Sequence, residues 1–276
     1  MSAPIKPAGR SGRRSRRRSL GLLAALAAVL AAAGGYHLLA RPDRQAGEAF
    51  SGLPHRYAYA SAEAPGGVRL HIMTVQPEDI ELRAVNAPLR GIAAYGINGG
   101  FFYGTDLLSV AIVDDAPVAG TRGAYGSGWF NAKYARGTLV WDGAEDKLSV
   151  QVVSSGDDIA VADRSRYWAQ GGISMNLQRG DLWAAAAEAE HLPFAADKRL
   201  RSGLVYDAGG QLQLIVTDTL STAEEFRSAI LSSIPGEGLE GIFLDGDGSS
   251  QMNADEAVLP GDSRPVVQMI ALRGEE

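Results

Sequence analysis

The 276-residue sequence contains no cysteine, which excludes disulfide bonds, thiolate zinc sites and a cysteine nucleophile. Its histidines are few and scattered, and none lies near a glycine-rich motif: His37, His55, His71 and His191. A histidine-ligated zinc site or a Ser-His-Asp triad therefore lacks its parts. The sequence also has no Gly-x-x-x-x-Gly-Lys phosphate loop and no Gly-x-Gly-x-x-Gly motif after an expected strand.

Positive charge is scarce after the first 19 residues. Residues 1–19 carry seven Lys and Arg and no acid, while the whole chain has a formal net charge of −6, so the remainder carries −13. Nucleic-acid binding needs clustered cations, so we expect no nucleic acid as a partner. The same acidity is also consistent with a role in solubility alone.

An apolar segment follows the basic one, over residues 20–40. It just reaches the length of about 20 residues that an uncleaved membrane anchor needs, and it also fits the apolar core of a cleaved signal peptide. No clean Ala-x-Ala cleavage site follows it, which favours the anchor. With residues 1–19 in the cytoplasm, we expect an extracytoplasmic protein, periplasmic or on the cell surface, either tethered to the inner membrane or secreted.

Residues 41–56 read as a linker, and residues 57–276 as one domain. Apolar and polar residues alternate over residues 68–75 and 80–85, which predicts strands. Further strands are expected over residues 110–113, 138–141, 148–153, 204–206, 212–217, 241–244 and 266–272. Many strands with few helices predict a mixed α/β (α+β) domain, with a mixed multi-stranded sheet and a few packed helices.

Two helices are expected. The four residues from Thr222 to Glu225 form a capping-box pattern, and Phe226, Ala229 and Ile230 follow at helical spacing. The alanine-rich residues 182–191 form the second expected helix.

The first candidate for chemistry is the run Asn98, Gly99, Gly100, Phe101 and Phe102. Paired glycines allow close approach of the backbone to a ligand, and an amide offers both a donor and an acceptor to a sugar or phosphate. A phenylalanine could stack on a sugar ring. An ordinary glycine turn with two core aromatics explains the same run.

The second candidate follows an apolar strand and consists of Asp245, Gly246, Asp247, Gly248, Ser249 and Ser250. Carboxylates at a strand end are rigidly held, small neighbours leave room for a substrate, and the backbone N–H groups of such a loop can bind an anion. A tight turn is the first alternative. A calcium loop is the second, because Asn253 and Glu256 continue an EF-hand-like spacing, but its sixth position is serine where glycine is required and a strand precedes it.

Two softer motifs lie between these. Gln170, Gly171 and Gly172 again place an amide beside paired glycines. Arg201 stands immediately before an expected strand, where it could hold a phosphate through two hydrogen bonds; a solvated basic turn is the alternative.

Taken in order, these four motifs resemble the phosphodiester glycosidase family over roughly residues 65–273. The first motif is similar to the Asn-Gly-Gly-Phe-Phe of the family. Gln170 to Gly172 are similar to its Gln-x-Gly-Pro, without the proline, and Arg201-Ser202 is similar to its Arg-Thr/Ser. The last motif resembles Leu-Asp-Gly-Gly-Gly-Ser-Ser, with Asp247 where the family usually has glycine.

The resemblance implies hydrolysis of a sugar-1-phosphodiester in envelope or exopolysaccharide metabolism. Arg201 would hold the phosphate, Asp245 would be the catalytic carboxylate with Asp247 as its competitor, and Asn98 and Gln170 would orient the sugar. Neither the motifs nor the resemblance assigns a cofactor, metal dependence stays open, and calcium stays an alternative. The rival hypotheses are a non-catalytic glycan-binding or polysaccharide-assembly accessory protein and a calcium-stabilised adhesion domain.

Overall fold

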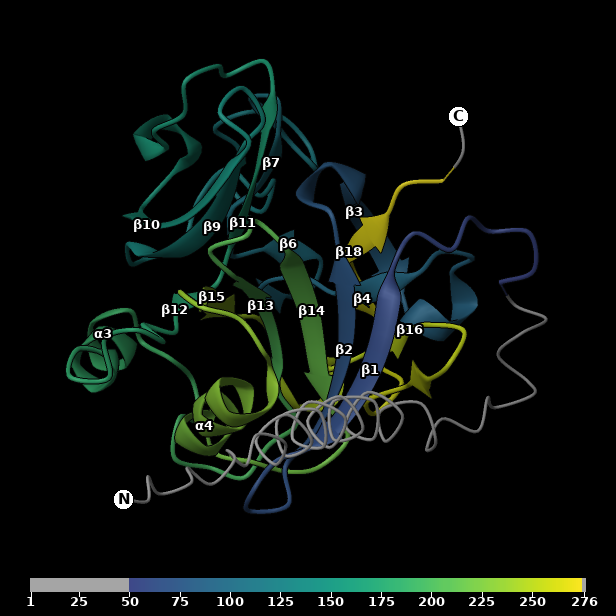
Figure 1. Ribbon diagram of the computed structural model, residues 1–276. Helices are drawn as coiled ribbons and strands as arrows, with labels where there is room; N and C mark the ends of the chain where they lie inside the picture. Colours follow the sequence, from purple (N-terminus) through teal and green to yellow (C-terminus); the bar gives the residue numbers. More distant parts are fainter. Residues whose placement is uncertain (1–49, 275–276) are drawn as a thin grey trace, which may run out of the picture. The chain divides into compact units, whose positions relative to one another are not determined.

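The computed structural model describes residues 50–274, which are mainly β-structure. The predicted basic segment, the anchor or signal segment and most of the linker lie outside the described residues. A six-stranded sheet has the order β1 (Ala58–Glu63), β2 (Arg69–Val75), β14 (Leu212–Thr217), β13 (Ser202–Tyr206), β15 (Glu240–Phe243) and β12 (Ile173–Ser174) (Figure 1). Residues 50–274 all belong to one compact unit. In the described part of the chain, no helix is long and apolar enough to span a membrane.

Two five-stranded sheets and one hairpin complete the β-structure. One sheet has the order β17 (Val258–Leu259), β16 (Met252–Asn253), β4 (Gly96–Asn98), β18 (Val266–Leu272) and β3 (Ile80–Ala87). The other has the order β10 (Lys147–Val153), β9 (Arg136–Asp142), β11 (Tyr167–Gly171), β7 (Ala111–Val113) and β8 (Ala116–Pro117). The hairpin pairs β5 (Phe102–Tyr103) with β6 (Asp106–Leu107).

All strand ladders among residues 50–274 are antiparallel. The expected mixed sheet is therefore corrected to antiparallel sheets. Short turns join several neighbouring strands, such as β1 with β2 and β9 with β10, and a connection of that length can join only an antiparallel pair, because a parallel pair needs a crossover of a dozen or more residues. The long connections from β12 to β13 and from β14 to β15 also lead into strands that pair antiparallel with their neighbours.

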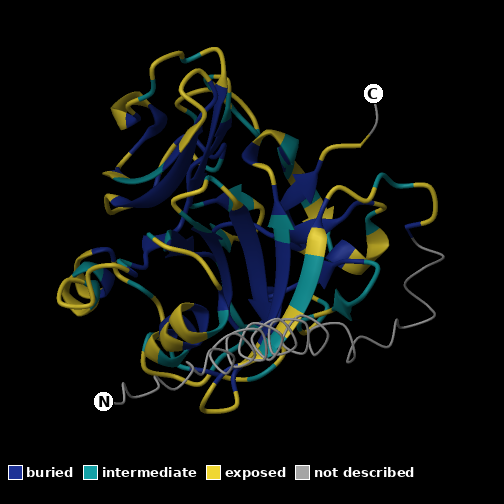
Figure 2. Ribbon diagram, viewed as in Figure 1, coloured by how far each residue is buried: buried dark blue, intermediate teal, exposed yellow. Residues whose placement is uncertain are grey.

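The six-stranded sheet is buried on both faces at its centre. On β14, Leu212, Leu214 and Val216 face the largest core cluster, which they share with the other sheets. Ile215 points to the opposite face, where it packs with residues of α4 (Ala223–Ser233). The period of two along the strand therefore lets one sheet serve two cores. Figure 2 shows these central strands as buried, while the edge strand β1 is largely exposed.

Between residues 50 and 274 the α-helices are few and short. The α4 helix begins with the predicted capping box: the Thr222 side chain accepts a hydrogen bond from the Glu225 amide at 3.2 Å, and the Glu225 carboxylate accepts one from the Thr222 amide at 2.8 Å. The alanine-rich helix α3 spans Trp183–Ala189. Four single 3-10 turns occur at Pro77–Asp79, Leu89–Gly91, Gly156–Asp158 and Asp247–Ser249.

The nine expected strands are confirmed, each within a few residues of its predicted bounds. The additional strands are mostly two or three residues long, such as β4, β12 and β16. Such short segments carry no readable alternation, because the pattern needs at least four residues to appear.

The capping box gives a test of the fold. Replacing Thr222 by alanine removes the acceptor for the Glu225 amide, so the free energy of unfolding should fall by about 1 kcal/mol. Urea unfolding of the variant and of Thr105→Ala, an exposed threonine in the hairpin turn, measures this difference. Equal stabilities of the two variants would contradict the assigned role of the cap.

Candidate active site

A small pocket of about 140 Å³ lies at the end of β15. Five of the residues around it are charged: Arg199, Arg201, Asp245, Asp247 and Arg264. The rest of the lining is largely apolar and includes Phe101, Leu192, Phe194 and Phe243. The strand-end loop and the first aromatic of the Asn-Gly-Gly-Phe-Phe run, nearly 150 positions apart in the sequence, thus line the same cavity.

Asp245 is the partly buried carboxylate of this pocket. Burial raises its pKa to about 6, and the negative charge of Asp247 acts in the same direction. Hydrogen bonding from Ser249 and from the Gly246 backbone, together with the positive charge of Arg264, opposes the increase. Near neutral pH this carboxylate therefore changes its protonation state easily, as a catalytic acid or base must.

Asp247 occupies a left-handed backbone conformation, with φ of 55°. Glycine adopts this region without strain, and aspartate is one of the few other residue types that tolerate it. The backbone conformation at this position therefore admits the aspartate that the sequence places there. The Asp247 carboxylate accepts a hydrogen bond from Arg199 Nη1 at 2.9 Å.

Arg201 brings a buried positive charge to the pocket, with 5% of the residue exposed. Its Nε donates to the Ser221 carbonyl at 3.1 Å, and its Nη2 donates to the Phe194 and Asp197 carbonyls at 2.8 Å each. Within residues 50–274 it forms no ion pair, and no hydrogen bond of Nη1 is present. Burial lowers the pKa of this guanidinium, which nevertheless stays charged.

The two other arginines of the pocket are already paired with carboxylates. Arg264 binds the Asp262 carboxylate through Nε and Nη2. Arg199 binds Asp197 at 3.2 Å as well as Asp247, and its guanidinium lies 4.5 Å from the centre of the Phe194 ring. Of the three arginines of the pocket, only Arg201 therefore has no carboxylate partner among the described residues.

Asn98 lies directly behind the pocket, with 1% of the residue exposed. Its Nδ2 donates to the Asp245 carbonyl at 2.8 Å, while its Oδ1 accepts from the Ser202 hydroxyl at 2.8 Å and from the Gln251 amide at 3.1 Å. One side chain thus fixes the strand-end loop to β13, the strand that follows Arg201. Asn98 positions Asp245 and presents no free polar atom to a ligand.

The paired glycines approach buried amides. Gly100 N donates to Gln268 Oε1 at 3.0 Å, and Gln170, 0% exposed, exchanges hydrogen bonds with the same Gln268 amide. A Cβ on Gly99 would lie 2.2 Å from Gln268 Oε1, and one on Gly171 would lie 2.5 Å from Asn131 Oδ1. Close packing of amide side chains therefore accounts for these glycines without a ligand.

The structure brings together only part of the predicted site. Phe101, Arg201, Asp245, Gly246 and Asp247 line the pocket. The other predicted contact residues lie in its surroundings: Asn98, Gly99, Gly100, Gln170, Gly171, Gly248, Ser249 and Ser250. Ser249 supports Asp245, and a Cβ on Gly248 would collide with Asp262 Oδ2 at 2.1 Å.

Seven of the twelve lining residues were not predicted from the sequence, among them Arg199, Phe194 and Arg264. Arg199 stands two positions before Arg201, in the same short basic stretch, where nothing in the sequence separated it from a solvated turn. Phe194 and Arg264 come from loops without a motif, so nothing local in the sequence pointed to them.

The residues of the EF-hand-like spacing do not form a cluster of carboxylates in the described part of the chain. No three His, Cys, Asp or Glu side chains of residues 50–274 gather as a metal site would require. Asn253 donates to three backbone carbonyls, and Glu256 accepts from the Tyr57 hydroxyl at 3.0 Å. These two members of the EF-hand-like spacing therefore have other partners.

No family model matches the chain, and no curated protein matches it. A solved structure similar to it is the catalytic domain of zebrafish N-acetylglucosamine-1-phosphodiester alpha-N-acetylglucosaminidase, auto-inhibited by its pro-peptide. That likeness has a TM-score of 0.54 and 14% identity, and covers 82% of this chain and 85% of that chain. A hypothetical protein from Synechocystis has a TM-score of 0.45 and 14% identity, covering 79% of this chain and 62% of that one. The zebrafish likeness shows that the two chains share a fold.

The raised pKa of Asp245 predicts a pH-dependent stability. The folded state binds a proton at about pH 6, whereas the unfolded carboxylate binds it near its ordinary 3.8, so ionised Asp245 destabilises the folded protein at neutral and alkaline pH. At pH 8 the free energy of unfolding of Asp245→Asn should therefore exceed that of the parent by up to about 3 kcal/mol, and the variant should unfold at a higher temperature. Both differences should shrink toward pH 4. Thermal unfolding at both pH values measures it, and a variant that is less stable at pH 8 would contradict the buried-carboxylate account.

Proposed function

We propose that the protein hydrolyses a sugar-1-phosphodiester, releasing a free sugar and a phosphomonoester. The observation that carries the proposal is the pairing, in one pocket, of a carboxylate whose pKa is about 6 with a buried arginine that has no carboxylate partner among the described residues. The first group suits proton transfer near neutral pH, and the second suits a phosphate. The shared fold with a catalytic domain named for such a substrate supports the same reaction.

Arg201 is the proposed phosphate-binding residue. Its Nε and Nη2 are held by backbone carbonyls, which orients the guanidinium, and Nη1 remains for a phosphate oxygen. A buried cation without a counter-ion is costly, so a bound phosphate would offset that cost. The paired Arg199 and Arg264 would add positive potential at the rim of the pocket.

Asp245 is the proposed base. Its carboxylate takes a proton from water, the water oxygen bonds to the anomeric carbon, and the bond from that carbon to the phosphate oxygen breaks. The electron pair stays on the phosphate, which leaves as a monoester and needs little protonation because its second pKa is about 6. The proton on Asp245 then returns to solvent. If Asp245 instead attacks the carbon directly, a second step with water gives the same products.

Asp247 is assigned a supporting role. Its carboxylate is paired with Arg199, so it contributes to the charge balance of the pocket while Asp245 carries the proton transfer. Asn98 and Gln170 are buried, and their hydrogen bonds stabilise the segments that carry Asp245 and Phe101. The sugar contacts therefore fall to Phe101 and to the loop from Asp245 to Asp247.

The setting of the reaction is also a proposal. The basic and apolar N-terminal segments support an extracytoplasmic protein tethered to or exported across the inner membrane. The substrate would then be an envelope or exopolysaccharide glycosyl phosphate.

Turnover of the methyl phosphodiester of N-acetylglucosamine 1-phosphate tests the reaction. Asp245→Asn should lower kcat by at least about a hundredfold, because a positioned base contributes about 10²–10⁴. In the parent, kcat should fall as the pH drops below about 6, where Asp245 becomes protonated. Release of N-acetylglucosamine measures both effects.

Asp163→Asn, which changes an exposed aspartate far along the chain, is the matched control and should keep full turnover. Undiminished turnover in Asp245→Asn would remove Asp245 from the mechanism. Binding of the diester by the parent without any hydrolysis would select the non-catalytic glycan-binding alternative.

A further inference from the structure

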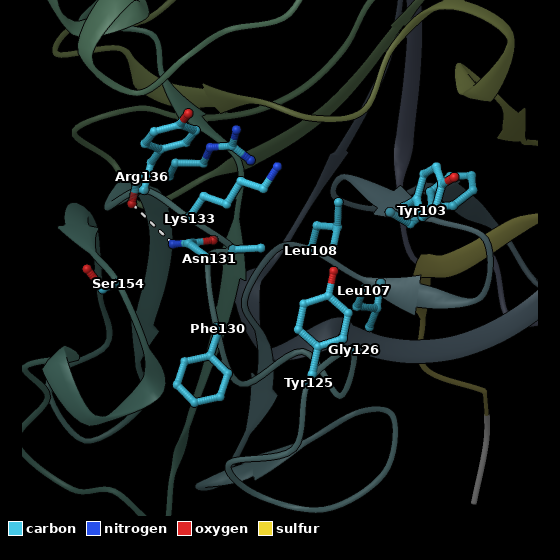
Figure 3. Close-up of a pocket in the computed structure, with 13 residues that line it drawn as sticks. Tyr103, Leu107, Leu108, Tyr125, Gly126, Phe130, Asn131, Lys133, Arg136 and Ser154 are labelled. Carbon is cyan, nitrogen blue, oxygen red and sulfur yellow. Dashed lines mark hydrogen bonds between the residues drawn. The ribbon is translucent and has the colours of Figure 1, made fainter.

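A second and larger pocket, of about 780 Å³, lies beside the β5–β6 hairpin and the segment that leads into β9 (Figure 3). Its volume falls in the range of ordinary small-molecule sites, whereas the Asp245 pocket is smaller than most of them. We call it the aromatic pocket, after Tyr103, Tyr125, Phe130 and Tyr134 in its lining. The reaction proposed above makes no use of it.

The aromatic residues of this pocket are unusually open to solvent. Tyr103 is 77% exposed and Tyr125 is 69% exposed, while Phe130 and Tyr134 are each 37% exposed. The face of an aromatic ring is electron-rich, so it attracts the C–H bonds of a sugar ring that lies flat on it. Several exposed rings around one hollow therefore suit a saccharide.

The same pocket is positively charged. Lys133 and Arg136 line it, none of its lining residues is acidic, and the two side chains extend in the same direction in Figure 3. This differs from the chain after residue 19, which carries −13. Two carboxylates lie nearby without lining the pocket: Asp106, next to Gly126, and Glu190, which binds the amides of Gly137 and Ser174.

Arg136 is the buried member of the pair, with 8% of the residue exposed. Its Nε donates to the Glu190 carbonyl at 3.0 Å. Its guanidinium lies 5.3 Å from the centre of the Phe101 ring and 5.7 Å from that of Tyr134. Among residues 50–274 no carboxylate forms an ion pair with it, although the charge of the Glu190 carboxylate acts on it from nearby. That carboxylate is bound to the Gly137 and Ser174 amides, so the Arg136 guanidinium can still pair with an anion in the pocket.

Side chains that pack against one another lie between this pocket and the Asp245 pocket. Phe101 lines the Asp245 pocket and stacks against Arg136, which lines the aromatic pocket. Tyr134 stacks on His191 with ring centres 3.7 Å apart, and His191 directly precedes Leu192 of the Asp245 pocket. The two pockets are therefore neighbours, with the contact between Phe101 and Arg136 lying between them.

We propose that the aromatic pocket binds an acidic saccharide, a sugar chain that bears carboxylate or phosphate groups. The tyrosines would stack on its rings, and Lys133 and Arg136 would pair with its anionic groups. The binding itself is independent of turnover. Only the further step, that this saccharide is the extended part of the substrate cleaved at Asp245, rests on the proposed function.

Isothermal titration of the full-length chain tests the site with three probes: a galacturonate hexamer, a phosphorylated mannan oligosaccharide and neutral mannohexaose. At least one acidic probe should bind about tenfold or more tightly than mannohexaose. Tight binding of the galacturonate hexamer identifies carboxylate as the recognised anion, and tight binding of the phosphorylated mannan oligosaccharide identifies phosphate. Lys133→Asn should weaken that binding about tenfold, as should Tyr125→Ala. Asparagine is chosen because Lys133 has a φ of 71°, which asparagine tolerates.

Lys147→Asn, which removes the same charge from an exposed position on β10, is the control and should leave the affinity unchanged. Equal binding of mannohexaose, no binding of either acidic probe, or equal losses in Lys133→Asn and Lys147→Asn would overturn the proposal. Asp245→Asn should bind the acidic probe as the parent does. If the parent binds the acidic probe but does not hydrolyse the sugar-1-phosphodiester, the proposed reaction is rejected and the proposed saccharide binding in the aromatic pocket is retained.

Discussion

The hydrogen bonds of the Asn98 amide hold the candidate site together. Three segments that are distant in the sequence meet at this one buried side chain: the Asp245 loop, the start of β13 at Ser202 and the backbone at Gln251. A buried amide with all its partners in place is directional, so it fixes the loop in one arrangement where apolar packing alone would allow several. Close packing also explains the glycines beside Asn98, because a Cβ on Gly99 would collide with the Gln268 amide and one on Gly100 with the Ser109 and Gln170 side chains.

The electrostatics of the pocket follow from that arrangement. The loop holds Asp245 where burial raises its pKa to about 6, and the neighbouring strand start holds Arg201 against backbone carbonyls. Asp247 adds a negative charge that Arg199 neutralises, so this aspartate leaves the Arg201 guanidinium available. A site of this kind combines a titratable carboxylate with an oriented cation, which is what the cleavage of a glycosyl phosphate would use.

Much of the framework was predictable from the sequence, because long alternating segments such as residues 68–75 and 212–217 and the Thr222 cap are local signals. The antiparallel pairing was not, since it depends on contacts between distant strands. In the site, the structure places Asp245, Asp247, Arg201 and Phe101 around one pocket, and their predicted roles stay predictions. The buried positions of Asn98 and Gln170 were not predicted from the sequence. A motif of an amide and two glycines looks the same whether the close neighbour is a ligand or another buried amide.

Hydrolysis in water enriched with ¹⁸O tests most directly whether the anomeric carbon is the atom attacked. With the methyl phosphodiester of N-acetylglucosamine 1-phosphate as substrate, mass spectrometry of both products locates the label. Attack at the anomeric carbon, assisted by Asp245, places the ¹⁸O in the released sugar and none in the methyl phosphate. Label in the methyl phosphate would show that the phosphorus–oxygen bond breaks, and would contradict the account.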